Sequence, residues 1–236
     1  MGDYIKQSEP EFDQFAGDYR HIHTENISKV SGTDSEYFTE YKIREIKDRQ
    51  QIDPSMWLDL GCGDGLTAKF VRAYYPDTKY YGIDISDLSI REGQERQIPE
   101  TEFILYDGKH FPFPDETFDV VFSACVFHHI PPKDRDGIID ECLRVLKPGG
   151  KLFVFEHNTY NPVTRKIVKD CIFDAEAILL KESDFRKQIK SHKFKNVNRR
   201  FTIFFPRKAP FKGLIKLERH LGWCMFGGQY YIAAEK

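Results

Sequence analysis

Three glycines at alternating positions, Gly61, Gly63 and Gly65, stand between an apolar stretch, Met56–Leu60, and a segment of helical character, Leu66–Tyr75. A glycine-rich turn between a strand and a helix lets a ligand approach the backbone where any Cβ atom would collide. Turns of this kind bind nucleotides or nucleotide-like cofactors, and the spacing of the glycines indicates which class.

The glycine spacing and the nearby carboxylates separate two classes of cofactor. A dinucleotide fingerprint places glycines at the first, third and sixth positions, with a pyrophosphate on the helix N-terminus. Here the sixth position is Leu66, and carboxylates lie before, within and beyond the turn, at Asp59, Asp64 and Asp84. These carboxylates would repel a pyrophosphate, but they suit a cofactor with ribose hydroxyls, an amino group and a positive sulfonium.

The segment L-D-L-G-C-G-D-G resembles the first motif of the class I S-adenosylmethionine-dependent methyltransferases, and Y-G-I-D-I-S resembles their second. P-F-P-D-E-T-F-D-V-V is similar to the fourth-strand region of the small-molecule group of the ubiquinone and menaquinone type, methyltransferase type 11. The resemblance covers roughly residues 56–156 and implies S-adenosyl-L-methionine as the cofactor. The cofactor-binding residues that it implies are Tyr19, Asp59, Gly61, Cys62, Gly63, Asp84, Ile85, Asp107, Gly108 and Ala124.

The resemblance also assigns roles to four of these residues. It implies that Asp84 holds the ribose hydroxyls, that Ile85 packs on one face of the adenine, and that Asp107 accepts a hydrogen bond from the adenine amino group beside Gly108. An Asp-Gly pair is also a common turn. The register with the two preceding motifs favours the binding role.

The N-terminal segment Phe12–Arg20 reads F-D-Q-F-A-G-D-Y-R and resembles the F-D-x-x-A-x-x-Y-D opening of many small-molecule methyltransferases, where a short helix covers the cofactor. Arg20 stands where that pattern has Asp. The resemblance implies that Tyr19 contacts the cofactor. An aromatic side chain packed on the sheet edge is the alternative.

Transfer of a methyl group from a sulfonium is an in-line displacement, so alignment of acceptor, methyl carbon and sulfur supplies most of the acceleration. A general base is needed only where the acceptor must lose a proton. The candidate catalytic residues are His128 and His129 after the fourth strand, and Glu156 and His157 on the fifth. For each of them a purely structural role is the alternative.

Three functions remain open at this point. The leading one is a methyltransferase that acts on a small-molecule or lipid-like acceptor. The sequence contains no N-P-P-Y or D-P-P-Y motif and no Pro-Cys nucleophile, which argues against a nucleic-acid base as acceptor. The alternatives are a non-catalytic S-adenosylmethionine-binding module and an NAD(P)-dependent oxidoreductase.

The order of apolar segments predicts an α/β fold, with a Rossmann-like seven-stranded, mostly parallel sheet, helices on both faces and an antiparallel C-terminal strand pair. We expect one domain, 1–236, with a helical lid (1–53), a cofactor-binding core (54–156), and a substrate-side insertion with closing strands (157–236). The expected strands are Met56–Leu60, Lys79–Ile85, Phe103–Tyr106, Phe118–Phe122, one that leads to Glu156, Val197–Phe205 and Gln229–Ala234. The expected helices are Ser35–Gln51, Leu66–Tyr75, one that Ser86 begins, Lys133–Leu146, one that Ser183 caps, and Phe211–Leu221.

The composition fits a protein of the cytoplasm. The 236 residues are 40% hydrophobic, which is enough for a sizeable core, and the formal net charge of −2 implies no polyanionic partner such as nucleic acid. The five cysteines form no C-x-x-C pair, so neither a disulfide framework nor a metal site is expected. No apolar run approaches the ~20 residues that span a bilayer, and the N-terminus lacks the shape of a signal peptide.

Residues 181–220 are basic, with 13 Lys or Arg against 3 Asp or Glu. One interpretation is a surface that attracts an anionic acceptor or makes peripheral contact with a membrane. The other is the solvated faces of a helix and a strand. The spread of the charges over several elements favours the second.

Overall fold

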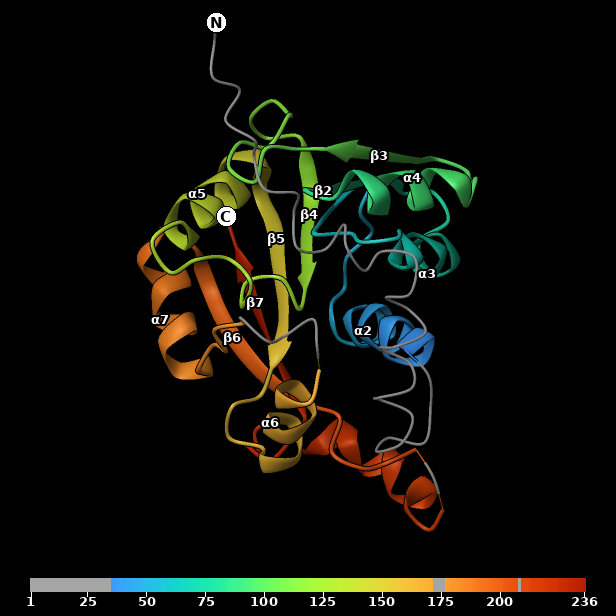
Figure 1. Ribbon diagram of the computed structural model, residues 1–236, viewed down its shortest axis with the longest axis vertical. Coiled ribbons are helices and arrows are strands. Elements are labelled where there is room, and N and C mark those ends of the chain that lie inside the picture. Colours follow the sequence, from blue (N-terminus) through green and yellow to red (C-terminus); the bar gives the residue numbers. More distant parts are fainter. Residues whose placement is uncertain (1–34, 172–176, 208) are drawn as a thin grey trace, which may run out of the picture.

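The computed structural model describes residues 35–171, 177–207 and 209–236, which form a layered α/β structure (Figure 1). The strands are β1 (Met56–Leu60), β2 (Lys79–Asp84), β3 (Thr101–Leu105), β4 (Phe118–Ala124), β5 (Leu146–His157), β6 (Lys195–Thr202) and β7 (Gln229–Glu235). The helices are α2 (Ser35–Arg49), α3 (Leu66–Tyr74), α4 (Asp87–Glu95), α5 (Arg135–Val145), α6 (Pro162–Lys169), α7 (Glu182–Ser191) and the 3₁₀ helix η3 (Phe211–His220).

The sheet has seven strands in the order β3-β2-β1-β4-β5-β7-β6. The neighbours from β3 to β5 pair in parallel, whereas β7 lies between β5 and β6 and runs antiparallel to both. The predicted fold class is therefore confirmed. The last two strands are not joined by a tight turn, since residues 203–228, which include η3, connect them.

Alternate residues of the central strands bury their side chains on opposite faces of the sheet. Val121 and Val154 belong to one apolar cluster, which also contains residues of α5 and α7, such as Ile138 and Phe185. Their neighbours, such as Phe122, belong to a second cluster with residues of α2 and α3. A sheet with helices on both faces needs continuous apolar strands, and the sequence of β4 supplies one.

Two elements differ from the sequence prediction, each for a local reason. Ser183 does not cap the sixth helix: α7 already begins at Glu182, and the amides of Asp184 and Phe185 bond to the carbonyl of Lys181. The sixth strand, β6, does not reach residue 205. The backbone amides of Phe204 and Phe205 do not pair with β7 but each donate a hydrogen bond of 2.9 Å to the Glu218 carboxylate.

Helix α6 was not predicted, although its first residues carry a recognisable signal. Asn161 is the N-cap, and its Oδ1 accepts from the amides of Val163 and Thr164 at 2.9 and 3.1 Å. Pro162 occupies the first helical position, where its missing N–H costs nothing. The helix lies beyond the carboxyl end of β5 and, with η3, extends this end of the sheet (Figure 1).

Candidate cofactor and acceptor site

The three glycines between β1 and α3 all adopt left-handed backbone conformations, with φ of 69° at Gly61, 52° at Gly63 and 74° at Gly65. The amides of residues 61 and 62 both donate to the carbonyl of Ile83, at 2.8 and 3.1 Å, so the turn is fixed to β2. A Cβ at Gly61 would lie 2.4 Å from Val126 Cγ2, whereas one at Gly63 would meet nothing within 4 Å. The turn is therefore tightly packed at Gly61, whereas the space next to Gly63 is open.

Asp84, at the end of β2, holds the open part of this turn in place. Its Oδ2 accepts from the amide of Gly63 at 2.9 Å, and its Oδ1 accepts from the amide of Ser86 at 3.0 Å. Ser86 in turn caps α4, since its hydroxyl accepts from the amide of Ser89 at 3.1 Å. One carboxylate thus links the glycine turn to the start of the next helix.

Ile85, Asp107 and Gly108 meet on the far side of the same turn. Ile85 is 41% exposed, and a Cβ at Gly108 would lie 3.4 Å from its Cγ2. The Oδ1 atom of Asp107 accepts from the amides of His110 and Lys109, and these bonds lower the pKa of its carboxyl. An exposed apolar side chain therefore lies next to an ionised carboxylate, as the binding of a flat base requires.

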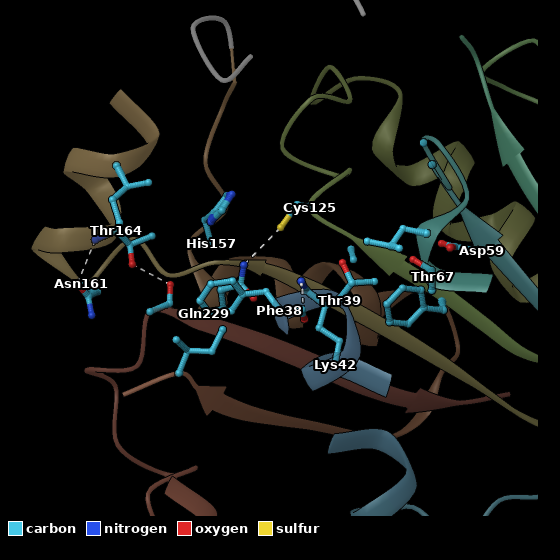
Figure 2. Close-up of a pocket in the computed structure, with 18 of the residues that line it drawn as sticks. Phe38, Thr39, Lys42, Asp59, Thr67, Cys125, His157, Asn161, Thr164 and Gln229 are labelled. Carbon is cyan, nitrogen blue, oxygen red and sulfur yellow. Dashed lines mark hydrogen bonds between the residues drawn. The ribbon is translucent and has the colours of Figure 1, made fainter. Parts of the chain in front are cut away.

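A cavity of about 370 Å³ opens beside the turn (Figure 2). Helix α2, the glycine turn, the ends of β4 and β5, α6, residues 203–206 and the start of β7 surround it. Of the predicted cofactor-binding residues, it is lined by Asp59, Gly61, Cys62, Gly63 and Ala124. Asp84, Ile85, Asp107 and Gly108 lie outside its lining. Tyr19 lies outside the described residues.

Asp59 is a buried carboxyl group at one end of the cavity. It is 2% exposed, and Tyr80 donates its hydroxyl to Oδ2 at 2.6 Å. Burial raises the pKa of Asp59 to about 7, against the opposing effect of the hydrogen bonds from Tyr80 and Thr67. A cationic group in the cavity would stabilise the ionised form of this carboxyl.

Lys42 of α2 is a cation that the sequence prediction missed. It is 8% exposed, lines the cavity, and donates to the carbonyl of Phe38 at 3.4 Å. No carboxylate in the described part of the chain makes an ion pair with it. Burial lowers the pKa of its ammonium group, although Cys125 and Asp59 act in the opposite direction. A buried ammonium without a carboxylate partner is suited to bind an anionic group.

The four predicted catalytic side chains occupy different positions. His157 lines the cavity, whereas His128, His129 and Glu156 do not. His128 Nδ1 lies 2.6 Å from Glu156 Oε2, and both side chains are buried. Burial alone would raise the pKa of Glu156, but the charge of His128 and its hydrogen bond outweigh this and lower the pKa. Oε1 of Glu156 accepts from the amide of Phe127 at 2.9 Å, so the pair joins the loop after β4 to β5.

The far end of the cavity combines amide, hydroxyl and apolar side chains. Gln229 Nε2 lies 3.6 Å from Cys125 Sγ, and the buried Oε1 atom of Gln229 has no hydrogen-bond partner. Thr164 donates its hydroxyl to the carbonyl of Gly228 at 2.9 Å. Figure 2 shows Asp59 at one end of the cavity and Asn161 and Thr164 at the other.

Comparisons with known proteins agree with this geometry. Residues 58–154 match a family model described as a methyltransferase domain. Over 118 residues the chain is 31% identical to the demethylmenaquinone methyltransferase of Thermotoga maritima, covering 50% of each chain. Over 97 residues it is 38% identical to the phthiotriol/phenolphthiotriol dimycocerosates methyltransferase of Mycobacterium leprae, covering 40% of this chain and 35% of the relative. The matched regions thus span half or less of the curated relatives' length.

The fold has close structural counterparts. A SAM-dependent methyltransferase from Thermotoga maritima superimposes with a TM-score of 0.67 over 95% of this chain and 98% of the other, at 17% identity. The segment that matches the methyltransferase-domain model runs from β1 into β5 and contains the glycine turn. The solved structure shares the fold of this chain over nearly its whole length.

No described helix is both long and apolar enough to cross a membrane. No group of three or more His, Cys, Asp or Glu side chains in the same part of the chain could hold a metal ion.

Proposed function

We propose that this protein is an S-adenosylmethionine-dependent methyltransferase that transfers a methyl group to a small-molecule or lipid-like acceptor. The observation that carries the proposal is one cavity in which an open left-handed glycine turn, the buried carboxyl of Asp59 and the buried ammonium of Lys42 come together. The sequence match to methyltransferases of lipid-like compounds supports the nature of the acceptor.

The residues present fit the chemical groups of this cofactor. Lys42 would supply a positive charge for the carboxylate of the cofactor, and Asp59 would supply a carboxyl group for the positively charged part of the cofactor. Asp84 lies where the ribose hydroxyls would meet the turn, and Ile85 with Asp107 would hold the adenine between an apolar side chain and an acceptor oxygen. Gly63 leaves room for this approach, since a Cβ there would have no neighbour.

The protein contributes position and exclusion of water rather than covalent chemistry. When bound, S-adenosylmethionine supplies an electrophilic methyl group on a sulfonium. The cavity walls hold the acceptor in line with that methyl group, which accounts for most of the acceleration of such a displacement. Where the acceptor must lose a proton, His157 is the predicted base that faces the cavity. His128 and Glu156 fix the loop behind it.

Calorimetric titration with S-adenosylhomocysteine and, separately, with NADH tests the class of cofactor. We expect binding of the first and none of the second. The reverse result would refute the proposal. Transfer of a labelled methyl group to 2-naphthol, a simple hydroxylated aromatic probe, then separates an enzyme from a silent cofactor-binding module.

Lys42→Met tests the proposed carboxylate contact. Loss of a charge-assisted hydrogen bond costs about 1.5–3 kcal/mol, which corresponds to roughly 10- to 100-fold weaker binding of S-adenosylhomocysteine. Lys47→Met is the matched control, because Lys47 lies on the same helix but is exposed and contacts the ring of Tyr75 instead. Equal affinities of the two variants would exclude Lys42 from the site.

A further inference from the structure

The part of the cavity farthest from the glycine turn contains no charged side chain among the described lining residues. Among the described residues, two carboxylates and one ammonium group line the cavity, those of Asp59 on β1, Asp64 in the turn and Lys42 on α2. The far part is mainly apolar, with walls formed by Val163, Ile167, Ile203, Phe204 and Phe205. Because the proposed cofactor carboxylate takes up Lys42, no other Lys or Arg among the described lining residues remains for an acceptor.

The basic residues of 181–220 do not supply the missing charge. None of those with described side chains lines the cavity. Arg186 and Arg199 pair with Glu182, at 3.0 and 3.6 Å, on the far side of the sheet's last strands. Arg207 makes two hydrogen bonds of 2.8 Å to Glu218. The charges of these three arginines are therefore neutralised away from the cavity, and they provide no support for an anionic acceptor.

Gln229 places one unsatisfied polar group in these otherwise apolar surroundings. It stands opposite His157 in the antiparallel register of β5 and β7, so both side chains lie on the same face of the sheet. Its Nε2 is directed at Cys125 Sγ, and its Oε1 is buried without a partner. A buried amide oxygen of this kind is costly unless a donor meets it, and because Gln229 lines the cavity, a rotation of its side chain would present the oxygen to a donor there.

We infer that the acceptor is an uncharged, largely apolar molecule with one hydroxyl or N–H group, and that Gln229 selects and orients it by accepting a hydrogen bond from that group. The inference rests on the proposed function, since it assigns the glycine-turn end of the cavity to the cofactor. An acceptor with a carboxylate or phosphate would lose its hydration without meeting a Lys or Arg side chain among the described residues of this part of the cavity, which disfavours its binding.

Three matched probes test the inference: 2-naphthol, 6-hydroxy-2-naphthoate and 2-methoxynaphthalene. The second adds a carboxylate to the first, and the third removes the donor. They are titrated at pH 8 into the protein saturated with S-adenosylhomocysteine and into the cofactor-free protein. We expect 2-naphthol to bind at least about tenfold more tightly than either of the others. Equal or tighter binding of the naphthoate, or no binding of 2-naphthol, would overturn the inference.

The Gln229→Met variant tests whether the side chain of Gln229 causes the difference in affinity between the probes. Methionine has a similar length but no strong hydrogen-bonding group, so the tenfold difference between 2-naphthol and 2-methoxynaphthalene should disappear while the affinity for S-adenosylhomocysteine stays unchanged. Gln188→Met is the control, because Gln188 is bonded to Asp136 on the surface. A difference that persists in Gln229→Met would exclude Gln229 as the selecting residue.

The two proposals fail in different ways. Absence of S-adenosylhomocysteine binding in the wild-type protein would refute the proposed function. Lys42 would then be available to a carboxylate, so in the cofactor-free protein the comparison of 2-naphthol with 2-methoxynaphthalene is the one that still tests the role of Gln229. Normal cofactor binding with a preference for the naphthoate would leave the function in place and refute the assignment of the acceptor.

Discussion

The Asp59→Asn substitution should stabilise the protein above neutral pH, although it removes a residue of the motif beside the glycine turn. Asp59 is 2% exposed, and burial raises the pKa of its carboxyl to about 7. Among the described residues, the cation that influences it is Lys42, and no ion pair joins these two side chains. Ionisation of Asp59 in the absence of a bound cation therefore costs folding free energy.

The sign and size of the difference in stability follow from the pKa of Asp59 in the unfolded chain and in the folded protein. In the unfolded chain Asp59 loses its proton near its ordinary pKa of 3.8, whereas in the folded protein it keeps the proton until about pH 7. Between these values the folded state holds the extra proton, so the free energy of unfolding falls as the pH rises. At about 1.4 kcal/mol per pH unit, the contribution lost by pH 8 is about 4 kcal/mol.

Urea denaturation of the wild-type protein and of Asp59→Asn, at intervals from pH 4 to pH 8, measures this contribution. The two proteins should be of similar stability at pH 4, and the variant should be more stable by about 4 kcal/mol at pH 8. In a chain of this length that corresponds to roughly 10 °C in Tm. A difference that does not change between pH 5 and pH 8 would refute the reasoning.

Asp119→Asn provides a control of opposite sign. Burial alone would raise the pKa of Asp119, but hydrogen bonds from Lys147, Ser55 and the amide of Met56 outweigh it and lower the pKa. Its stabilising contribution is therefore present above its ordinary pKa of 3.8 and is lost as the pH falls. This variant should be less stable than the wild-type protein at pH 8, and the difference should shrink toward pH 3.

Four further substitutions test separate parts of the site. Gly61→Ala should lower the free energy of unfolding, measured in urea, by at least about 2 kcal/mol because its Cβ would lie 2.4 Å from Val126. Gly63→Ala has open space around the new Cβ and should lower the free energy of unfolding by only about 1 kcal/mol through backbone strain. It should nevertheless weaken binding of S-adenosylhomocysteine. Glu156→Gln should destabilise the protein by about 3–5 kcal/mol by breaking a buried pair; unchanged stability with lost turnover would instead show direct catalysis. Glu218→Gln should speed hydrogen exchange of the amides at residues 204 and 205, which its carboxylate binds, and unchanged exchange would contradict that anchoring role.

The cofactor half of the site could be predicted from the sequence because its signals are local. The glycines, Asp84 and Asp107 each follow a strand within a few residues, and parallel strands bring their carboxyl ends to one edge. The resemblance implied that Ile85 and Gly108 both lie near the adenine, and in the structure a Cβ at Gly108 would lie 3.4 Å from Ile85 Cγ2. Whether they bind adenine stays a prediction.

The acceptor half could not be predicted because it depends on contacts between distant segments. Lys42 is one of two lysines on α2, and only the packing of α2 beside the turn makes it buried. Gln229 faces the cavity because β7 inserts between β5 and β6 in a register that places it opposite His157. A shift by one residue would turn its side chain to the other face of the sheet. The sequence alone carries no sign of that register.

The same contrast explains why the number of charges in the basic segment is a poor guide to the acceptor. A count of charges treats residues 181–220 as one surface, but in the folded chain Glu45, Glu182 and Glu218 come from three elements and pair with its arginines. What reaches the cavity from this region is instead the apolar run at residues 203–206, which leaves the sheet where Glu218 binds its amides. The buried acid therefore orders an apolar wall, and the physical argument for a neutral acceptor rests on that wall rather than on the net charge of the segment.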